Sequence, residues 1–176
     1  MNKLSEGKVQ VYTGNGKGKT TAALGLMLRA AGAGMEIYFG QFMKTGNTSE
    51  ARALREFLSG AVTMEQYGSG EELSGPDRER DATCARAGYD KARAALVSGQ
   101  YDLVVLDEIL VAEHLGLLAV DDLLRLMDER PAHTELVFTG RWAAEAVRQR
   151  ADLVTEMGEV KHYFHAGLPA RTGIEM

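Results

Sequence analysis

The chain has 176 residues, a formal net charge of −5 and a sequence pI near 5.4. Hydrophobic residues make up 45% and charged residues 26%, a balance typical of a globular protein and unlike that of a disordered or fibrous chain. An acidic chain offers no overall basic field to a nucleic-acid backbone, so we do not expect nucleic acid as a partner. The length predicts one domain, residues 1–176, with its own core.

The sequence also bears on location and on cysteine chemistry. No apolar run approaches the ~18 residues that cross a bilayer, and residues 1–6 lack the apolar stretch of a signal peptide. We therefore expect a cytoplasmic protein without a membrane partner. Cys84 is the single cysteine, so it has no partner for an internal disulfide or a zinc motif, and we expect an unreactive helix residue.

Short β-branched or aromatic runs alternate with longer segments of helical periodicity, which is typical of a parallel α/β sheet. We predict strands over residues 8–12, 36–42, 62–67, 103–106, 136–139 and 153–156. We predict helices over residues 19–31, 49–58, 77–98, 120–129 and 143–150. The third helix opens with Ser74-Gly75-Pro76-Asp77 and closes at Gly99, which are typical start and stop signals.

The segment Thr13-Gly14-Asn15-Gly16-Lys17-Gly18-Lys19-Thr20-Thr21 follows a predicted strand and opens a helix. This setting is typical of a phosphate-binding loop, because glycines let backbone N–H groups converge on an anion at a helix N-terminus. Lys19 would contact phosphate oxygens, and the Thr20 hydroxyl would be a ligand of Mg2+. One departure is Thr13, which stands where the usual spacing has Gly or Ala.

A second predicted strand ends in two carboxylates, at Asp107 and Glu108. The carboxyl ends of strands in doubly wound sheets face the ligand crevice, so these acids are expected near the phosphates. Either one can hold magnesium, directly or through water, and in an ATPase Glu108 could also orient a hydrolytic water. The fold expected from both motifs is a P-loop NTPase-like (RecA-like), mostly parallel sheet with helices on both faces.

Other candidates are less specific. Arg141 follows a third strand end and can meet phosphate bidentately, whereas Arg29 near the end of the first helix either reaches nucleotide or lies along the surface. His162 and His165 are weak metal candidates, because no carboxylate or cysteine stands in a convincing frame beside them.

A set of blocks, taken together and in this order, resembles the P-loop type of ATP:corrinoid adenosyltransferase over nearly the whole chain. They are Gly14-Asn15-Gly16-Lys17-Gly18-Lys19-Thr20-Thr21-Ala22-Ala23, Gln41-Phe42, Leu106-Asp107-Glu108, Thr139-Gly140-Arg141, Ala151-Asp152-Leu153-Val154-Thr155-Glu156-Met157, Val160-Lys161-His162, Ala166-Gly167 and Gly173-Ile174-Glu175.

The resemblance implies transfer of the 5′-deoxyadenosyl group of ATP to the Co(I) of a reduced corrinoid, with release of triphosphate. Members of this family are described as binding ATP in a reversed sense along the loop, so that the triphosphate is held whole. Cobalt(I) is itself a strong nucleophile, so no general base is required. The resemblance further implies Mg2+ or Mn2+, a flavodoxin-like or flavin reductant, and a homodimer.

The site residues expected from the motifs and the resemblance fall into three groups. The catalytic candidates are Lys19 and Glu108, and the metal candidates are Thr20, Asp107 and Glu108. The nucleotide-binding candidates are Gly14, Asn15, Gly16, Lys17, Gly18, Lys19, Thr20, Thr21, Arg29 and Arg141.

One block departs from the family pattern. Better-known relatives carry a Phe-x-Trp stretch after the Gly-x-Gly that corresponds to Gly68-Ser69-Gly70, and those aromatics are associated with displacing the lower ligand of the corrinoid. This chain has Glu71-Glu72-Leu73 there. The resemblance allows cobalamin or cobyrinic acid a,c-diamide as the acceptor. Because a corrinoid without its lower nucleotide has less need of that displacement, we hypothesise a preference for the earlier intermediate. An ATPase or kinase and a non-catalytic corrinoid-binding protein remain alternatives.

Overall fold

The computed structural model describes residues 4–46, 48–70 and 78–175. One six-stranded sheet has the order β3-β2-β4-β5-β1-β6, and every pairing between these strands is parallel. The strands are β1 (Val9–Thr13), β2 (Ile37–Phe42), β3 (Val62–Tyr67), β4 (Leu103–Asp107), β5 (Glu135–Thr139) and β6 (Leu153–Glu156).

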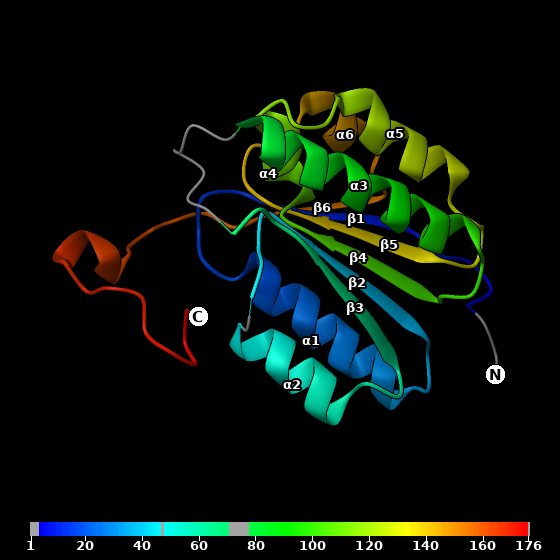
Figure 1. Cartoon of the computed structure of the whole chain (residues 1–176), viewed down its shortest axis with the longest axis horizontal. Helices are drawn as coiled ribbons and strands as arrows, with labels where there is room; N and C mark the ends of the chain where they lie inside the picture. The colour runs from blue at the N-terminus through cyan, green and yellow to red at the C-terminus, as the bar shows by residue number, and fades with distance from the viewer. Residues whose placement is uncertain (1–3, 47, 71–77, 176) are drawn as a thin grey trace.

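Helices cover both faces of the sheet (Figure 1). Helices α1 (Lys19–Gly32) and α2 (Ser49–Phe57) lie on one face. The other face carries α3 (Arg78–Val97), α4 (Ile109–His114), α5 (Val120–Glu129) and α6 (Glu145–Arg150). A 3-10 helix, η1 (Tyr163–Ala166), lies beyond β6 in a C-terminal segment that extends away from the sheet (Figure 1).

Strand sequences explain why both faces are covered. All residues of β2 and β4 are buried, as is typical of strands between two helical layers. Alternate side chains of β4 enter different cores: Val104 packs under the α3 and α5 layer, whereas Val105 packs under α1. The carboxyl ends of the strands all lie at one edge of the sheet because the pairing is parallel.

The predicted fold class is confirmed, and no predicted strand end is off by more than one residue. Two short elements, α4 and η1, were not expected from the sequence. Helix α4 has only six residues and begins one residue after β4, so it is too short to show a helical periodicity in the sequence. The predicted start of the third helix, Ser74-Gly75-Pro76-Asp77, lies outside the described residues.

Across the described ranges, no helix combines the length and apolar character that a membrane span needs.

Candidate functional site

The glycine-rich loop (residues 14–18) joins β1 to α1 and packs against the backbone that follows β6. The N–H of Gly16 donates to the carbonyl of Met157 at 2.7 Å, and the N–H of Met157 donates to the carbonyl of Thr13 at 2.8 Å. A Cβ atom on Gly16 would lie 2.8 Å from the carbonyl oxygens of Met157 and Gly158. Glycine is therefore required at this position by close backbone approach, and its N–H points to Met157 and not into an anion cradle.

The ammonium of Lys19, the first residue of α1, is held over the loop. It donates to the carbonyls of Gly14 and Gly16, each at 2.7 Å. Burial lowers the pKa of Lys19, although the negative charge of Glu108 opposes this shift. Two of the three ammonium donors are thus used, and the third is free for an anion above the loop.

Thr13, the departure from the usual loop spacing, is buried at the end of β1. Its hydroxyl accepts a 3.4 Å hydrogen bond from the N–H of Ala143, in the segment between β5 and α6. The threonine therefore ties the start of the loop to a neighbouring strand end without entering the site.

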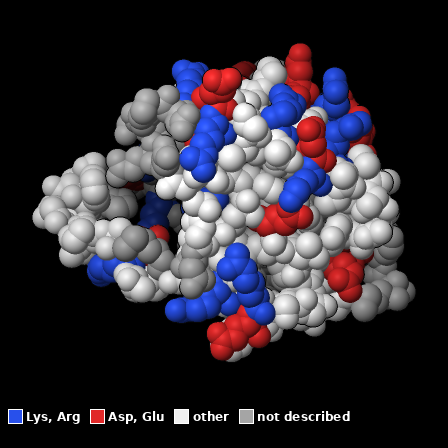
Figure 2. All heavy atoms as spheres, in the orientation of Figure 1, with Lys and Arg blue, Asp and Glu red and all other residues white. Residues whose placement is uncertain are grey.

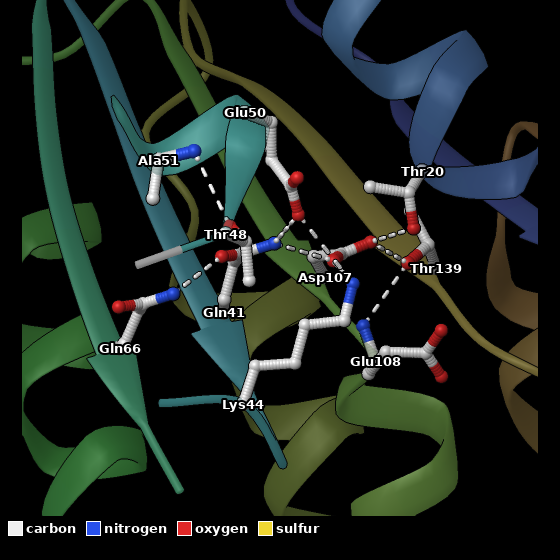
Figure 3. A network of polar contacts seen from close by, with 10 residues as sticks. All are labelled: Thr20, Gln41, Lys44, Thr48, Glu50, Ala51, Gln66, Asp107, Glu108 and Thr139. Atoms are coloured by element: carbon white, nitrogen blue, oxygen red, sulfur yellow. Dashed lines mark hydrogen bonds and ion pairs between the residues drawn. The ribbon is translucent and has the colours of Figure 1, made fainter. Parts of the chain in front are cut away.

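Asp107, at the end of β4, is the centre of a polar network (Figure 3). Its Oδ1 accepts hydrogen bonds from the hydroxyls of Thr20, at 2.8 Å, and Thr139, at 2.6 Å. Its Oδ2 accepts from Gln41 at 3.1 Å and lies 3.5 Å from the Lys44 ammonium. A fully buried carboxylate needs such partners, because an unpaired buried charge is strongly unfavourable.

Glu108 comes next in the chain and differs from Asp107 in its surroundings. Its backbone has φ 60°, an uncommon value for a residue other than glycine, and its N–H donates to the Thr139 hydroxyl at 3.0 Å. The side chain is directed away from the Asp107 carboxylate (Figure 3). Burial, followed by the charge of Asp107, raises the pKa of Glu108. The left-handed turn at Glu108 therefore sends two consecutive carboxylates in different directions.

A cavity of about 530 Å³ opens above the loop, within the size range of small-molecule sites. Figure 2 shows a hollow between the C-terminal segment and the rest of the molecule, with basic side chains at its wall. The residues that line the cavity are Asn15, Gly16, Lys17, Gly18, Lys19, Thr20, Thr21, Leu24, Lys44, Ser49, Glu50, Glu108, Arg141, His162, Gly173, Ile174 and Glu175.

Most of the predicted site residues therefore share this cavity, but Gly14, Asp107 and Arg29 do not line it. Gly14 and Asp107 contact residues that do, through Lys19 and Thr20. Arg29 is an exposed residue in the last turn of α1, about ten residues and roughly 15 Å along the helix from Lys19. Of the two readings of Arg29 that the sequence allowed, the structure places it on the surface. Arg141 does line the cavity, next to the end of β5.

Three polar residues in or after β2 were not among the predicted site residues: Gln41, which was noted only in a family block, Lys44 and Glu50. Gln41 Nε2 donates both to Asp107 and to Glu50, and the Lys44 ammonium lies 3.8 Å from the Glu50 carboxylate. Lys44 and Glu50 line the cavity. A lysine in a loop carries no motif, but its place after the end of a buried parallel strand is a signal that could have found it.

His162 and His165, the weak metal candidates, make hydrogen bonds with neighbouring residues. The Nδ1 of His162 accepts a hydrogen bond from the N–H of Phe164, and the Nε2 of His165 lies 2.6 Å from the Glu159 carboxylate. Among residues 4–46, 48–70 and 78–175 there is no cluster of three or more His, Cys, Asp or Glu side chains arranged to hold a metal ion. The oxygen pair of Thr20 and Asp107 is a different donor set, typical of a magnesium site completed by ligand and water oxygens.

Comparison with known proteins identifies the family of this chain. The family model for the ATP:corrinoid adenosyltransferases BtuR/CobO/CobP matches residues 5–176. The chain belongs to the ATP:corrinoid adenosyltransferase family.

Similar proteins in this adenosyltransferase family come from several bacteria. A corrinoid adenosyltransferase of Pseudomonas aeruginosa is 39% identical over 170 residues, which cover 96% of this chain and 83% of that protein. One from Sinorhizobium is 37% identical over 172 residues, covering 97% and 80%. One from Escherichia coli K12 is 34% identical over 169 residues, covering 96% and 85%. The resemblance inferred from the sequence blocks is thereby confirmed.

Proposed function

We propose that this member of the family transfers the 5′-deoxyadenosyl group of ATP to the Co(I) of a reduced corrinoid and releases triphosphate. The observation that carries the proposal is the single cavity that unites the glycine-rich loop, Lys19 and Thr20, with Thr20 bonded to the buried Asp107. A corrinoid before or after attachment of its lower nucleotide fits the proposal. Glu71-Glu72-Leu73, where the family's aromatic stretch is absent, lie outside the described residues.

The loop and its neighbours supply the contacts for the triphosphate. The third N–H of the Lys19 ammonium and the helix N-terminus face the space above the loop, where they would stabilise the charge that builds on the triphosphate as the C5′–O bond breaks. Lys17, Lys44 and Arg141 add cations to the same wall. These groups act on the leaving group, so they stabilise the transition state more than bound ATP.

Magnesium fits the donor set of the site. The cavity is lined by four basic side chains and three acidic ones, too small a positive excess to neutralise the several charges of a triphosphate. The hydroxyl of Thr20 and the carboxylate of Asp107 are hard oxygen donors on adjacent elements and would hold Mg2+, or Mn2+, together with phosphate and water oxygens. When bound, the ion would supply positive charge beside the leaving group. Glu108 remains a candidate for a water-mediated contact.

The contribution of the protein to the reaction is to position the triphosphate and the nucleoside of ATP. Carbon C5′ of ATP accepts the electron pair of Co(I), and triphosphate leaves from the opposite side, so no residue has to remove a proton. Lys19 and the loop hold the leaving group, and the walls of the cavity restrict where the nucleoside can lie. Burial raises the pKa of Glu108 above that of an ordinary glutamate, and the positive charges of Lys44 and Lys19 oppose this shift.

Three further features belong to the proposal. The corrinoid must be reduced to Co(I), which calls for a flavodoxin-like or flavin reductant. A homodimer is supported by the exposed apolar side chains of Leu153 and Val154 on edge strand β6. A cytoplasmic location suits an enzyme that consumes ATP and depends on a reductant.

An anaerobic assay with chemically reduced corrinoid, ATP and Mg2+ tests the proposal. We expect a light-sensitive cobalt–carbon bond, followed by its visible spectrum, and stoichiometric triphosphate measured by ion chromatography. ADP and phosphate as the products of turnover would instead indicate an ATPase or kinase. Binding of corrinoid without any product would indicate a carrier.

A further inference from the structure

The C-terminal arm (residues 158–175) is exposed along most of its length yet forms part of the cavity wall. It leaves the sheet after β6, carries η1 and turns back toward the N-terminal end of α1 (Figure 1). Val160 is fully exposed and Phe164 is 65% exposed, so packing onto the sheet does not hold this part of the arm. Gly173, Ile174 and Glu175 nevertheless line the cavity above the loop.

Lys17 of the glycine-rich loop makes the polar contacts that join the end of the arm to the loop. Its ammonium donates to the Tyr163 hydroxyl and to Glu175 Oε1, both at 2.8 Å. It also lies 5.6 Å from the centre of the Tyr163 ring, within range of a cation–π interaction. A loop residue and arm residues separated by 146 and 158 positions therefore meet at one ammonium.

The arm fixes the Glu175 carboxylate independently of Lys17. Arg171 donates from its backbone N–H to Oε2 at 2.8 Å and from Nη2 to Oε1 at 3.0 Å, and the Tyr163 hydroxyl also donates to Oε1. The Glu175 side chain is only 16% exposed, and its hydrogen bonds, first from Arg171 and then from Lys17, lower its pKa. A carboxylate held in this way is a preorganised acceptor for a cation, because little side-chain freedom remains to be lost.

The charges of this cluster favour an anion in the cavity. Lys17 and Arg171 carry two positive charges against the one negative charge of Glu175, so the cluster keeps a net charge of about +1. Lys17 uses two of its three N–H donors on the arm, which leaves one for a ligand in the cavity. Without Glu175, the Lys17 side chain would keep only its contacts with Tyr163 and would sample more rotamers.

We propose that Glu175 is a positioning residue: it holds Lys17 for contact with a bound polyphosphate, and the same contact fastens the arm over the cavity. The proposal rests on the proposed function only in taking a polyphosphate as the occupant. Coupling between two contacts is reciprocal, so a polyphosphate that binds more tightly when the arm is docked must also strengthen that docking by the same factor.

Binding of tripolyphosphate with Mg2+ to the full chain, measured by calorimetry, tests the positioning role. We expect Glu175→Gln to raise the Kd about 3- to 10-fold, since it removes one charge-assisted contact to a partly exposed lysine. Glu175→Asp, which keeps the charge on a shorter side chain, should recover part of the affinity. Lys17→Met should raise the Kd at least as much as Glu175→Gln, and the double variant should bind like Lys17→Met alone.

Glu129→Gln is the matched control, because Glu129 also pairs with an arginine, Arg93, but lies on α5 away from the cavity. Its Kd should equal that of the wild type. In the adenosyl-transfer assay, Glu175→Gln should raise KM for ATP more than it lowers kcat. An unchanged or lower Kd for Glu175→Gln would overturn the positioning role.

Hydrogen exchange of the arm tests the second half of the proposal. Amides of residues 163–175 should exchange more slowly in the wild type when tripolyphosphate and Mg2+ are added, and this protection should be reduced in Glu175→Gln. Faster exchange on adding the ligand would overturn the proposal, because it would mean that phosphate takes Lys17 away from Glu175 and releases the arm.

These measurements are separate from the test of the reaction. Tripolyphosphate binding and amide exchange need neither a corrinoid nor transfer of an adenosyl group. A wild-type chain that forms ADP in turnover would contradict the proposed function while leaving the contact between Glu175 and Lys17 supported. Conversely, normal triphosphate release with no effect of Glu175→Gln on binding or exchange would contradict only the positioning role.

Discussion

Asp107 shows how a single buried carboxylate can organise several elements. It has no exposed surface, and its two oxygens meet side chains from α1, β2, β5 and the loop after β2. Removing one partner of such a network leaves a desolvated polar group behind, which costs more than the net contribution of one hydrogen bond. Substitutions of Asp107 and of the hydroxyls of Thr20 and Thr139 should therefore affect one another, whereas the side chains of Lys19 and Glu108 make no hydrogen bond to the Asp107 carboxylate.

Lys19→Ala should lower kcat/KM for adenosyl transfer by about 10²- to 10³-fold, the range found when one preorganised donor to a developing charge is removed. Lys8→Ala is the control, since Lys8 pairs with Glu6 on the surface and does not line the cavity. The measurement is the initial rate under anaerobic conditions with chemically reduced corrinoid. Activity of Lys19→Ala near the wild-type value would contradict the assignment of this lysine to the leaving group.

Glu108→Gln should be more stable than the wild type at neutral pH, and this advantage should grow as pH rises from 4.5 through the raised pKa of Glu108. Burial raises the pKa of Glu108 in the folded state above its ordinary value of 4.5, so the folded state favours the protonated carboxyl. Ionisation between pH 4.5 and the raised pKa therefore costs the wild type stability that the neutral glutamine does not lose. Thermal unfolding should show a higher Tm for the variant at pH 7 and a difference that shrinks toward pH 4.5.

Glu56→Gln, at an exposed position of α2, supplies the reference for this pH series. Its Tm should follow that of the wild type throughout. A Tm of Glu108→Gln at or below the wild-type value at pH 7 would show that ionised Glu108 makes favourable contacts which outweigh its burial.

At the level of elements, the glycine-rich loop and the segment after β6 are packed as one piece. Backbone hydrogen bonds run in both directions between residues 13–16 and Met157. Only a residue without Cβ allows this approach at Gly16, and the result is a loop whose shape depends on β6 as well as on β1 and α1.

Gly16→Ala should lower the free energy of unfolding by about 1–3 kcal/mol, the usual cost of inserting a methyl group into a packed site, and should weaken binding of tripolyphosphate. Gly25→Ala is a matched substitution in α1, where an added Cβ meets nothing within 4 Å. It should raise the free energy of unfolding by about 0.5–1 kcal/mol, because alanine is the better helix former. Denaturant unfolding measures both, and equal effects of the two would contradict the packing argument.

The elements that the sequence predicts best are those with a strong local pattern. The apolar run of β4 and the glycines before α1 are patterns of only a few consecutive residues. Such local patterns are enough to predict the strand, the helix and a shared site between them. The docking of Glu175 on Lys17 and the contact of Gly16 with Met157 are not predictable in this way. They depend on pairing of β1 with β6, which brings together residues from opposite ends of the sequence and leaves no spacing rule to detect.

In the whole molecule, β6 is an edge strand with exposed apolar residues. It pairs with β1 on one side, and Leu153 and Val154 are 44% and 37% exposed. An unpaired apolar edge is a surface that proteins usually cover. This observation is consistent with the proposed homodimer, and β6 is the surface on which we expect the two copies to meet.

Sedimentation velocity should give a particle of twice the 19.1 kDa chain mass for the wild type. Val154→Lys should shift the population toward the single chain, because a charge at this edge would lose its hydration when the dimer buries it. Leu28→Lys, at a 62% exposed position of α1, is the control and should leave the mass unchanged. A wild-type chain that sediments as a monomer would contradict the dimer, and dissociation by Leu28→Lys instead would place the interface on α1.

The pairing of β1 with β6 also sets an order of events during synthesis. The loop that begins at Gly14 is synthesised well before Met157, whose carbonyl accepts the hydrogen bond from the Gly16 N–H. A nascent chain that ends before Met157 therefore lacks the backbone contact that shapes the loop. The ability to bind nucleotide should therefore arise only when β6 joins the sheet.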